Sequence, residues 1–213
     1  MLLYNRLNMN IAKCQTLIIL DWDDTLFPTT WVTSNRINLY TNIEKTKNLK
    51  YFRQLDEELS SFLSTLKKYG EIVIVTNALP EWIQTSSIVL PKTSVLLKDI
   101  RIFSARKMFQ DKYPSNGMKW KELTFREILT MKYENKSFAN IISIGDAEYE
   151  YNALINLINH EQDTAKILKS IRFIKNPSHN ILLEQLSTLK IAFPSISKKT
   201  THMDLAVELC GKV

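Results

Sequence analysis

Residues 17–26 read LIILDWDDTL: an apolar run leads directly into three aspartates within four positions. An apolar run of this length is typical of a buried strand, whereas carboxylates that lie close together repel one another and are costly to bury. A chain that drives a buried strand into such a cluster needs something there to compensate the charge. The stretch therefore predicts a polar site, at the end of a strand, in which a cation takes part.

Further short apolar runs alternate with helical patterns along the rest of the chain. Alternation of this kind predicts βαβ units and a mainly parallel sheet, so the expected fold class is α/β. The expected strands are 17–22, 72–76, 100–104, 141–145 and 171–174. The expected helices are 51–69, 80–90, 119–133, a segment around 153–158, and 178–190. Residues 105–118 are expected to form an irregular connection.

The 213 residues suffice for one domain with a complete hydrophobic core. We expect this domain to span 1–194, with 27–50 as a small insert. Residues 195–213 are expected to be a C-terminal tail with one amphipathic turn. Every apolar stretch is shorter than the roughly 18 residues needed to cross a membrane, so no membrane association is expected.

Charge and cysteine usage narrow the class of partner. The net charge is +6, but the basic residues are spread along the chain, so anionic partners are favoured and nucleic-acid binding is not expected. Cys14 and Cys210 lie near opposite ends, which argues against a disulfide framework or a zinc site and fits a cytoplasmic location. The four glycines lack the spacing of a nucleotide-binding loop.

Polar residues follow three of the expected strands. Asp21, Asp23 and Asp24 follow the first, Thr76-Asn77 ends the second, and Gly145-Asp146 ends the fourth. Ligands of open parallel sheets bind outside the carboxyl ends of the strands, so these groups are expected to meet. Oxygen ligands without cysteine or histidine suit Mg²⁺, which we expect as the cofactor.

These stretches resemble the motifs of the haloacid dehalogenase (HAD) superfamily of phosphohydrolases. Its first motif is a strand ending Asp-x-Asp-x-Thr, here DWDDT at 21–25; its second is a strand ending in Thr or Ser, here Thr76. Its fourth is Gly-Asp-x-x-x-Asp/Glu, here Gly145, Asp146 and Glu150. The resemblance implies a three-layer α/β/α sandwich with a mainly parallel, five-stranded Rossmannoid sheet. The combination of DWDDTL, TNALPEW, SAR, WKELTF and SIGDAEYE also resembles a eukaryotic subgroup of the superfamily.

The resemblance implies a catalytic role for each aspartate. Asp21 would be the nucleophile that becomes an aspartyl phosphate, and Asp23 would be the general acid and base. Mg²⁺ would be held by Asp21, the backbone carbonyl of Asp23, and Asp146, with Glu150 supporting it.

The phosphate would be bound by Thr76 and by a lysine of the third motif, with Asn77 as a further amide donor. The lysine is ambiguous, because Met118-Lys119-Trp120-Lys121 offers two candidates. We prefer Lys121, which precedes Asp146 by twenty-five positions, a common separation in the superfamily; Lys107 is a third choice.

Members of the superfamily choose substrates through cap domains inserted after the first or second motif. Both slots are short here, so little or no cap is expected and the site would be open to a small phosphorylated molecule or a phosphoprotein. The insert 27–50 carries Arg36, Lys45 and Lys47, which could attract an anionic substrate. A phosphatase is thus expected, with a non-catalytic scaffold or a phosphotransferase as alternatives and the oligomeric state left open.

Overall fold

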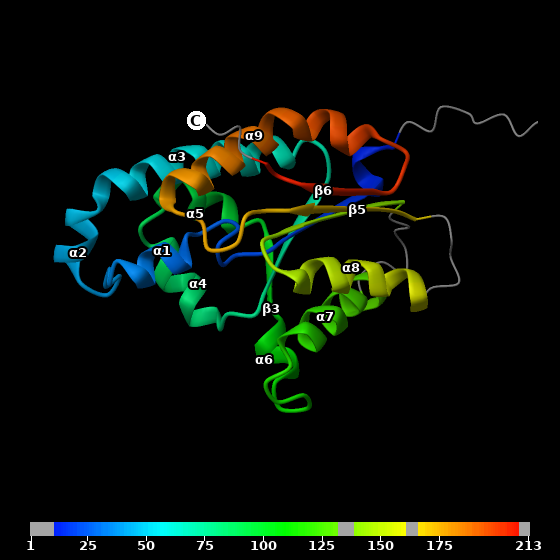
Figure 1. The fold of residues 1–213 in the computed structure, drawn as a ribbon, viewed down its shortest axis with the longest axis horizontal. Helices are drawn as coiled ribbons and strands as arrows, with labels where there is room; N and C mark the ends of the chain where they lie inside the picture. Colours follow the sequence, from blue (N-terminus) through cyan, green and yellow to red (C-terminus); the bar gives the residue numbers. More distant parts are fainter. Residues whose placement is uncertain (1–10, 132–138, 161–165, 209–213) are drawn as a thin grey trace, which may run out of the picture.

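Six parallel strands form the centre of the part of the molecule that the computed structural model describes, residues 11–131, 139–160 and 166–208 (Figure 1). Their order across the sheet is β3-β2-β1-β4-β5-β6, and every neighbouring pair is parallel. The strands are β1 Thr16–Leu20, β2 Glu71–Thr76, β3 Arg101–Ser104, β4 Asn140–Gly145, β5 Ile167–Arg172 and β6 Met203–Ala206.

Helices cover both faces of this sheet. α3 and α9 pack on one face, and α7 and α8 on the other (Figure 1). The helices are α1 Thr29–Ser34, α2 Asn42–Lys47, α3 Leu49–Leu66, α4 Pro80–Ser87, α5 Pro91–Leu97, α6 Ala105–Phe109, α7 Gly117–Met131, α8 Glu148–His160 and α9 His179–Lys198. The expected α/β/α sandwich is confirmed.

The first strand shows why the sequence folds this way. Successive side chains of a strand point to opposite faces, and both faces of a parallel sheet are buried. Leu17 and Ile19 accordingly lie in the apolar cluster under α7 and α8, whereas Ile18 and Leu20 lie in the cluster under α3 and α9. All four are essentially inaccessible to solvent. An uninterrupted apolar run is therefore required at the centre of the sheet.

The helix before β2 is equally readable from its sequence. Apolar side chains recur at helical spacing on the buried face of α3, where they meet α9 and the sheet. The chain then turns at Gly70, where a Cβ atom would lie 2.8 Å from the Thr16 carbonyl oxygen. The turn between α3 and β2 thus passes so close to β1 that only glycine fits.

The expected number of strands was wrong, because the sheet has six strands rather than five. The fifth strand also begins earlier than predicted, at Ile167 rather than at residue 171. Lys169 and Ser170 break the apolar run of this strand, yet both are buried. Buried strands are predicted from runs of apolar residues, so a strand that contains a lysine is predicted too short.

The expected tail from residue 195 also differs from the structure. α9 continues through Pro194 to Lys198, and β6 pairs with β5 as the edge strand of the sheet. Proline removes one helical N–H and often ends a helix, yet α9 runs past Pro194 and beyond the predicted end near residue 190. Residues 195–206 therefore contribute to the folded domain.

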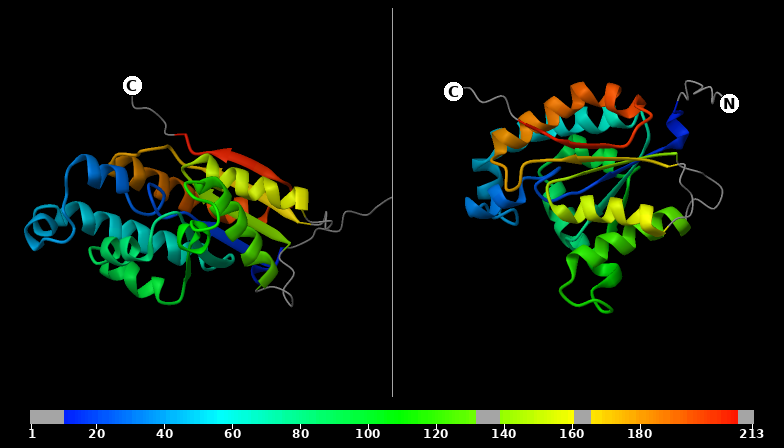
Figure 2. Two further views of the ribbon diagram at one scale, coloured as in Figure 1. Left: turned by 90° about the horizontal axis from the view of Figure 1, so that it is seen from below. Right: turned by 45° about the vertical axis from the view of Figure 1, so that its right-hand side comes forward.

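Four short helices, α1, α2, α5 and α6, were not predicted. The expected helix 80–90 is α4, and α5 follows it; each begins with a proline, which suits the first turn of a helix. Within the expected irregular segment 105–118, α6 forms with Ser104 as its N-cap, since its hydroxyl accepts the N–H of Lys107 at 3.1 Å. The insert 27–50 contains α1 and α2, which lie together at one end of the molecule (Figure 2).

Of the helices in the described ranges, each is too short or too polar to span a lipid bilayer.

Candidate active site

The carboxyl ends of β1, β2 and β4 meet as neighbours at one edge of the sheet. The ladder between β1 and β4 extends one residue further, because the N–H of Asp21 donates to the Ile144 carbonyl at 3.0 Å. This bond places Asp21 directly beside Gly145 and Asp146. Thr76, the last residue of β2, lies on the other side of β1. The topology thus brings the three predicted motifs together.

A tight turn follows β1 and reverses the chain within the first motif. The Trp22 carbonyl accepts backbone N–H groups from Leu26 and Phe27, both at 2.9 Å. Asp24 adopts a left-handed conformation, with φ of 54°. Its carboxylate accepts the N–H of Thr30 at 2.9 Å and also the Thr30 hydroxyl, so it anchors the start of α1. Asp24 therefore serves the turn and the insert rather than facing a substrate.

Lys121 projects from α7 into the acidic centre. Its ammonium lies 2.7 Å from Oδ1 of Asp21 and also bonds Oε1 of Glu150, and its side chain is only 2% exposed. Lys119 points elsewhere and pairs with Glu122 at 2.9 Å. Lys107 lies in α6, where its backbone N–H bonds Ser104. Of the three lysines considered, the structure brings Lys121 to Asp21.

Glu150 occupies the third position of α8 and is held from two sides. Its Oε2 accepts the N–H of Ala147 at 3.1 Å, as a glutamate does in a helix capping box, while its Oε1 accepts Lys121. A Cβ atom at Gly145 would lie 2.6 Å from Oε2 of Glu150. Any side chain at residue 145 would therefore displace Glu150, which explains the glycine at the end of β4.

Three carboxylates converge around this point. Asp21, Asp146 and Glu150 each offer an oxygen, and these oxygens lie within 4.8 Å of one another. Asp21 and Glu150 are buried, and Asp146 is half-buried. The cluster has the all-oxygen donor set that Mg²⁺ prefers.

The electrostatics show that the cluster carries more negative charge than Lys121 neutralises. Burial, followed by the charges of Glu150 and Asp24, raises the pKa of Asp146 to about 7. Burial also raises the pKa of Asp21 well above its usual value, and Lys121 only partly opposes this. Burial alone would lower the pKa of Lys121, but Asp21 and Glu150 outweigh it and raise that pKa. A further cation at the cluster would relieve the repulsion between the carboxylates.

Asp23 is half-buried and receives three side-chain hydrogen bonds. Its Oδ1 accepts the hydroxyl of Thr29 at 2.5 Å and the indole N–H of Trp82 at 2.7 Å. Its Oδ2 accepts the hydroxyl of Thr76 at 3.2 Å. The side chain is thus fixed beside Asp21 by three different elements.

Thr29 and Trp82 were not predicted from the sequence. Thr29 lies six residues beyond Asp23, and Trp82 six beyond Thr76, in the first turn of α4. The sequence does show that each of the two motifs is followed, six residues later, by a side chain that can donate a hydrogen bond. Such residues are common at the beginnings of surface helices, so this observation alone does not predict a contact with Asp23. Only the folded geometry identifies the acceptor.

The predicted phosphate-binding residues at the end of β2 are already bonded to protein groups. The Thr76 hydroxyl, besides donating to Asp23, accepts the N–H of Ala78 at 2.9 Å. The amide of Asn77 donates to the Gly117 carbonyl at 3.2 Å and so ties β2 to the start of α7. Asn77 therefore helps to place the helix that carries Lys121.

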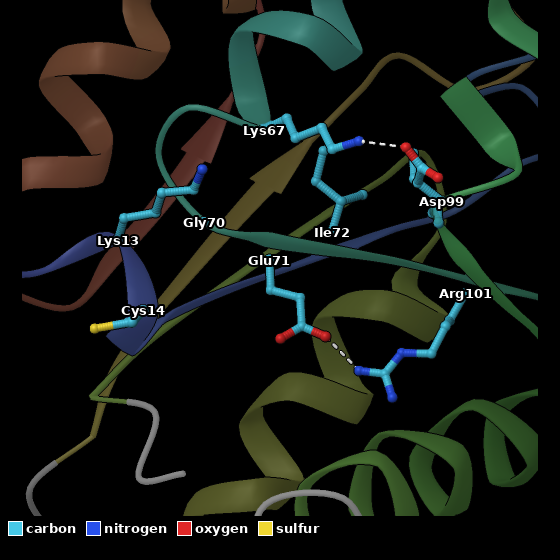
Figure 3. Close-up of a pocket in the computed structure, with 9 residues that line it drawn as sticks. Lys13, Cys14, Lys67, Gly70, Glu71, Ile72, Asp99 and Arg101 are labelled. Atoms are coloured by element: carbon cyan, nitrogen blue, oxygen red, sulfur yellow. Dashed lines mark hydrogen bonds and ion pairs between the residues drawn. The ribbon is translucent and has the colours of Figure 1, made fainter. Parts of the chain in front are cut away.

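A cavity of about 530 Å³ lies at the amino ends of the strands, where β2 and β3 begin (Figure 3). It is therefore at the opposite end of the strands from the carboxylate cluster. On its walls Lys67 pairs with Asp99 at 3.0 Å, and Glu71 pairs with Arg101. The first pair joins the segments that precede β2 and β3, and the second joins the first residues of these two strands. Acids and bases thus offset each other here, unlike in the cluster at the carboxyl edge.

The parallel sheet, the acidic carboxyl ends of its strands and the buried lysine are the arrangement that the three motifs of the HAD superfamily predict. The family model described as NLI interacting factor-like phosphatase matches residues 16–198. The chain belongs to this family of phosphatases, and the superfamily expected from the three motifs is confirmed.

Two solved structures from Legionella pneumophila are similar to the chain. The effector Ceg4 is 12% identical with a TM-score of 0.48, covering 84% of this chain and 94% of its own. The HAD domain of the effector Lem4 is 12% identical with a TM-score of 0.45, covering 86% of this chain and 97% of its own. A search of curated protein sequences gave no significant match.

Proposed function

We propose that this protein is a Mg²⁺-dependent phosphatase that hydrolyses phosphoric monoesters through an aspartyl phosphate on Asp21. The observation that carries the proposal is the buried contact of Lys121 with Asp21 and Glu150, beside Asp146 and with Asp23 two residues away. A lysine at this point orients the proposed nucleophile and faces the place where phosphate oxygens would arrive.

The carboxylate cluster fits a magnesium ion. Asp21, Asp146 and the backbone carbonyl of Asp23 would hold it, with Glu150 in support. The raised pKa values of Asp21 and Asp146 are consistent with a site that lacks one positive charge. When bound, Mg²⁺ supplies positive charge between the nucleophile and the phosphate.

In the first step, a carboxylate oxygen of Asp21 attacks phosphorus. The new bond from Asp21 to phosphorus forms while the bond from phosphorus to the leaving oxygen breaks, and Asp23 gives its proton to that oxygen. The alcohol departs and Asp21 carries the phosphoryl group.

In the second step, water attacks the phosphorus atom of the aspartyl phosphate. Asp23, now ionised, takes a proton from the water, the bond between Asp21 and phosphorus breaks, and inorganic phosphate leaves. Both carboxyl groups return to their starting states. Proton transfer by a positioned carboxyl group typically contributes about 10²–10⁴-fold.

Lys121 offsets charge on the phosphate oxygens during both steps. In the absence of substrate its ammonium bonds Asp21, so it already faces the reacting group. Thr76 would bind a phosphate oxygen after its hydroxyl turns away from Asp23, and Asn77 keeps a second amide hydrogen for the same purpose.

We further propose a bulky phosphorylated substrate, a phosphoprotein or another large ester. The insert after the first motif contributes two six-residue helices and no separate cap domain. Exposed apolar side chains lie at the beginnings of three helices: Leu79 at the N-cap of α4, Met118 in the first turn of α7 and Tyr149 in the first turn of α8. An open rim of this kind suits a large leaving group. Cysteine usage remains the support for a cytoplasmic location, and Cys14 is exposed and free.

The direct test is phosphate release from p-nitrophenyl phosphate by the purified full chain. We expect turnover with Mg²⁺, its loss with EDTA, and restoration by added Mg²⁺. Asp21→Asn should abolish turnover because an amide cannot act as the nucleophile, and the lowering should exceed about 10³-fold. Incubation with a phosphomonoester and acid quenching should trap phosphate on the wild-type protein and none on Asp21→Asn.

The same experiment separates the alternatives. A scaffold protein would release no phosphate with any ester. A phosphotransferase would trap phosphate on Asp21 but pass it to an added alcohol in preference to water. Equal turnover by wild type and Asp21→Asn would contradict the proposal.

A further inference from the structure

We propose that Trp82, together with Thr29, anchors Oδ1 of the Asp23 carboxylate and thereby makes Oδ2 the oxygen that gives and takes the proton. This rests on the phosphatase function proposed above. Trp82 is a positioning residue in this scheme, since it acts on the reaction only through Asp23.

The two oxygens of Asp23 differ in the chemistry of their partners. The indole nitrogen of Trp82, 2.7 Å from Oδ1, is a donor only and can never accept a hydrogen bond. A proton on Oδ1 could therefore not be directed at Trp82, and Oδ1 also accepts the Thr29 hydroxyl at 2.5 Å. Thr76, which bonds Oδ2 at 3.2 Å, has a hydroxyl that can donate or accept. Oδ1 thus accepts two short hydrogen bonds, one of them from a group that cannot accept a proton in return. Oδ2 accepts one longer bond, from a hydroxyl that is free to turn to the phosphate, so Oδ2 is the oxygen available to hold the proton.

The position of the Trp82 ring is fixed from several sides. It packs edge-on against Phe27, with ring centroids 5.8 Å apart, and Phe27 stacks on Trp22 at 6.2 Å. The Ser86 hydroxyl donates to the Trp82 carbonyl at 2.7 Å and accepts the indole N–H of Trp22 at 3.0 Å. These contacts join α4 to the turn after β1. They hold the Trp82 ring with its indole N–H directed at Asp23.

Thr29 supports the same arrangement from the insert. Its hydroxyl donates to Oδ1 at 2.5 Å, and it is the first residue of α1. Two short hydrogen bonds on Oδ1 and one longer bond on Oδ2 fix the rotation of the carboxylate and leave Oδ2 as the atom that carries the proton. In the first step the proton then passes from Oδ2 to the leaving oxygen as its bond to phosphorus breaks.

The test uses the dependence of the reaction on the leaving group. The leaving oxygen of phenyl phosphate is more basic than that of p-nitrophenyl phosphate, so it depends more on a proton from Asp23. We would measure kcat/KM, which reports phosphoryl transfer to Asp21, for both esters with the Mg²⁺-loaded full chain. Trp82→Phe keeps the shape of an aromatic ring and removes the N–H.

We expect Trp82→Phe to lower kcat/KM for phenyl phosphate about tenfold, as for loss of a hydrogen bond to a charged group. The value for p-nitrophenyl phosphate should fall much less, so the ratio between the esters changes. Thr29→Val should shift the ratio in the same direction, and this variant keeps the inference testable if Trp82→Phe folds poorly.

Trp120→Phe is the matched control. It also deletes one indole N–H whose hydrogen bond is 2.7 Å long, but that N–H donates to the Tyr113 carbonyl rather than to Asp23. We expect it to leave the ratio between the two esters unchanged, whatever it does to stability. Equal losses on both esters in Trp82→Phe and Thr29→Val would overturn the inference alone. A wild-type protein that hydrolyses neither ester would overturn the proposed function and this inference with it.

Discussion

Two lysines are buried in this protein to nearly the same extent, and their surroundings differ completely. Lys121 is 2% exposed and Lys169 is fully inaccessible. The ammonium of Lys121 bonds the carboxylates of Asp21 and Glu150, whereas that of Lys169 bonds the Ser197 carbonyl at 3.0 Å. Burial works against the charge of both, but the carboxylates raise the pKa of Lys121, while that of Lys169 falls to about 8. The partners, and not the burial, decide whether a buried lysine stays charged.

The comparison also separates a functional lysine from a structural one. Ser197 lies at the end of α9, where carbonyl groups have no partner within the helix. Lys169 from β5 and the Asn140 amide from β4, at 3.1 Å, both donate to this carbonyl. These two side chains of the sheet therefore supply hydrogen bonds to the C-terminal end of α9. Lys121, in contrast, faces carboxylates that can bind a metal and a phosphate.

The largest expected effect comes from removing each ammonium group in turn. Lys121→Met should lower kcat on p-nitrophenyl phosphate by about 10²–10³-fold, which is typical of losing one preorganised donor in an active site. Lys169→Met should keep turnover close to the wild-type value, because its contacts lie at the end of α9 and not at the carboxylate cluster. Steady-state kinetics with saturating Mg²⁺ would measure both.

Folding must be checked in the same preparations. Far-UV circular dichroism and thermal unfolding should show both variants folded at the assay temperature. A folded Lys169→Met variant that lost turnover as severely as Lys121→Met would contradict the division into a functional and a structural lysine.

The second prediction concerns stability and pH, and it involves Lys169. Between pH 8 and the ordinary lysine value of 10.5, the unfolded chain keeps this proton and the folded protein releases it. The unfolded state thus binds more protons, so this lysine makes stability rise with pH, and its cost is fully present below about pH 8. The wild-type free energy of unfolding, relative to that of Lys169→Met, should rise by about 1.5 kcal/mol between about pH 8 and pH 9.5.

Urea unfolding of both proteins at the two pH values would measure this difference. Subtracting the variant removes the contributions of the other groups that titrate in this range. A difference that stayed constant, or fell as the pH rose, would show that Lys169 keeps its proton in the folded protein.

The same two lysines show how far the sequence alone could lead. Lys121 was predicted because it lies at a set distance before Asp146 in a motif order that indicates one chemistry. The acidic ends of β1 and β4 could be predicted because clustered carboxylates repel one another unless a cation joins them, and the carboxyl ends of neighbouring parallel strands lie together. Apolar runs then placed the central strands, since a parallel sheet buries both faces.

Features that depend on distant partners could not be predicted in this way. Lys169 interrupts the apolar pattern of β5, and only the α9 carbonyl that it caps explains its burial. Pro194 signals the end of a helix, yet α9 continues to Lys198. Trp82 is an ordinary aromatic residue of a first helical turn until Asp23 is seen beside it. For Lys169 and Trp82 the deciding contact joins residues far apart in the chain.

The smallest expected effect concerns cations on the protein surface, in contrast to the buried Lys121 and Lys169. Arg36 and Lys47 of the insert are exposed and Lys45 is half-buried. The insert also contains Thr29, which contacts Asp23. Replacing all three with Ala should raise KM for a phosphopeptide with acidic flanks about fivefold, since each exposed charge contributes little. KM for p-nitrophenyl phosphate should not change.

Salt provides the internal check on this prediction, because interactions between exposed charges are screened at high ionic strength. The difference in KM between the wild type and the triple variant should therefore shrink as NaCl is added. A control variant in which Lys98, Lys198 and Lys199 become Ala removes the same net charge from exposed positions outside the insert. If the control raised KM as much as the insert variant, net charge alone would account for the attraction. If neither variant changed KM, the cations of the insert would have no role in binding the substrate. Of the cations compared, only the buried Lys121 would then act on the phosphate.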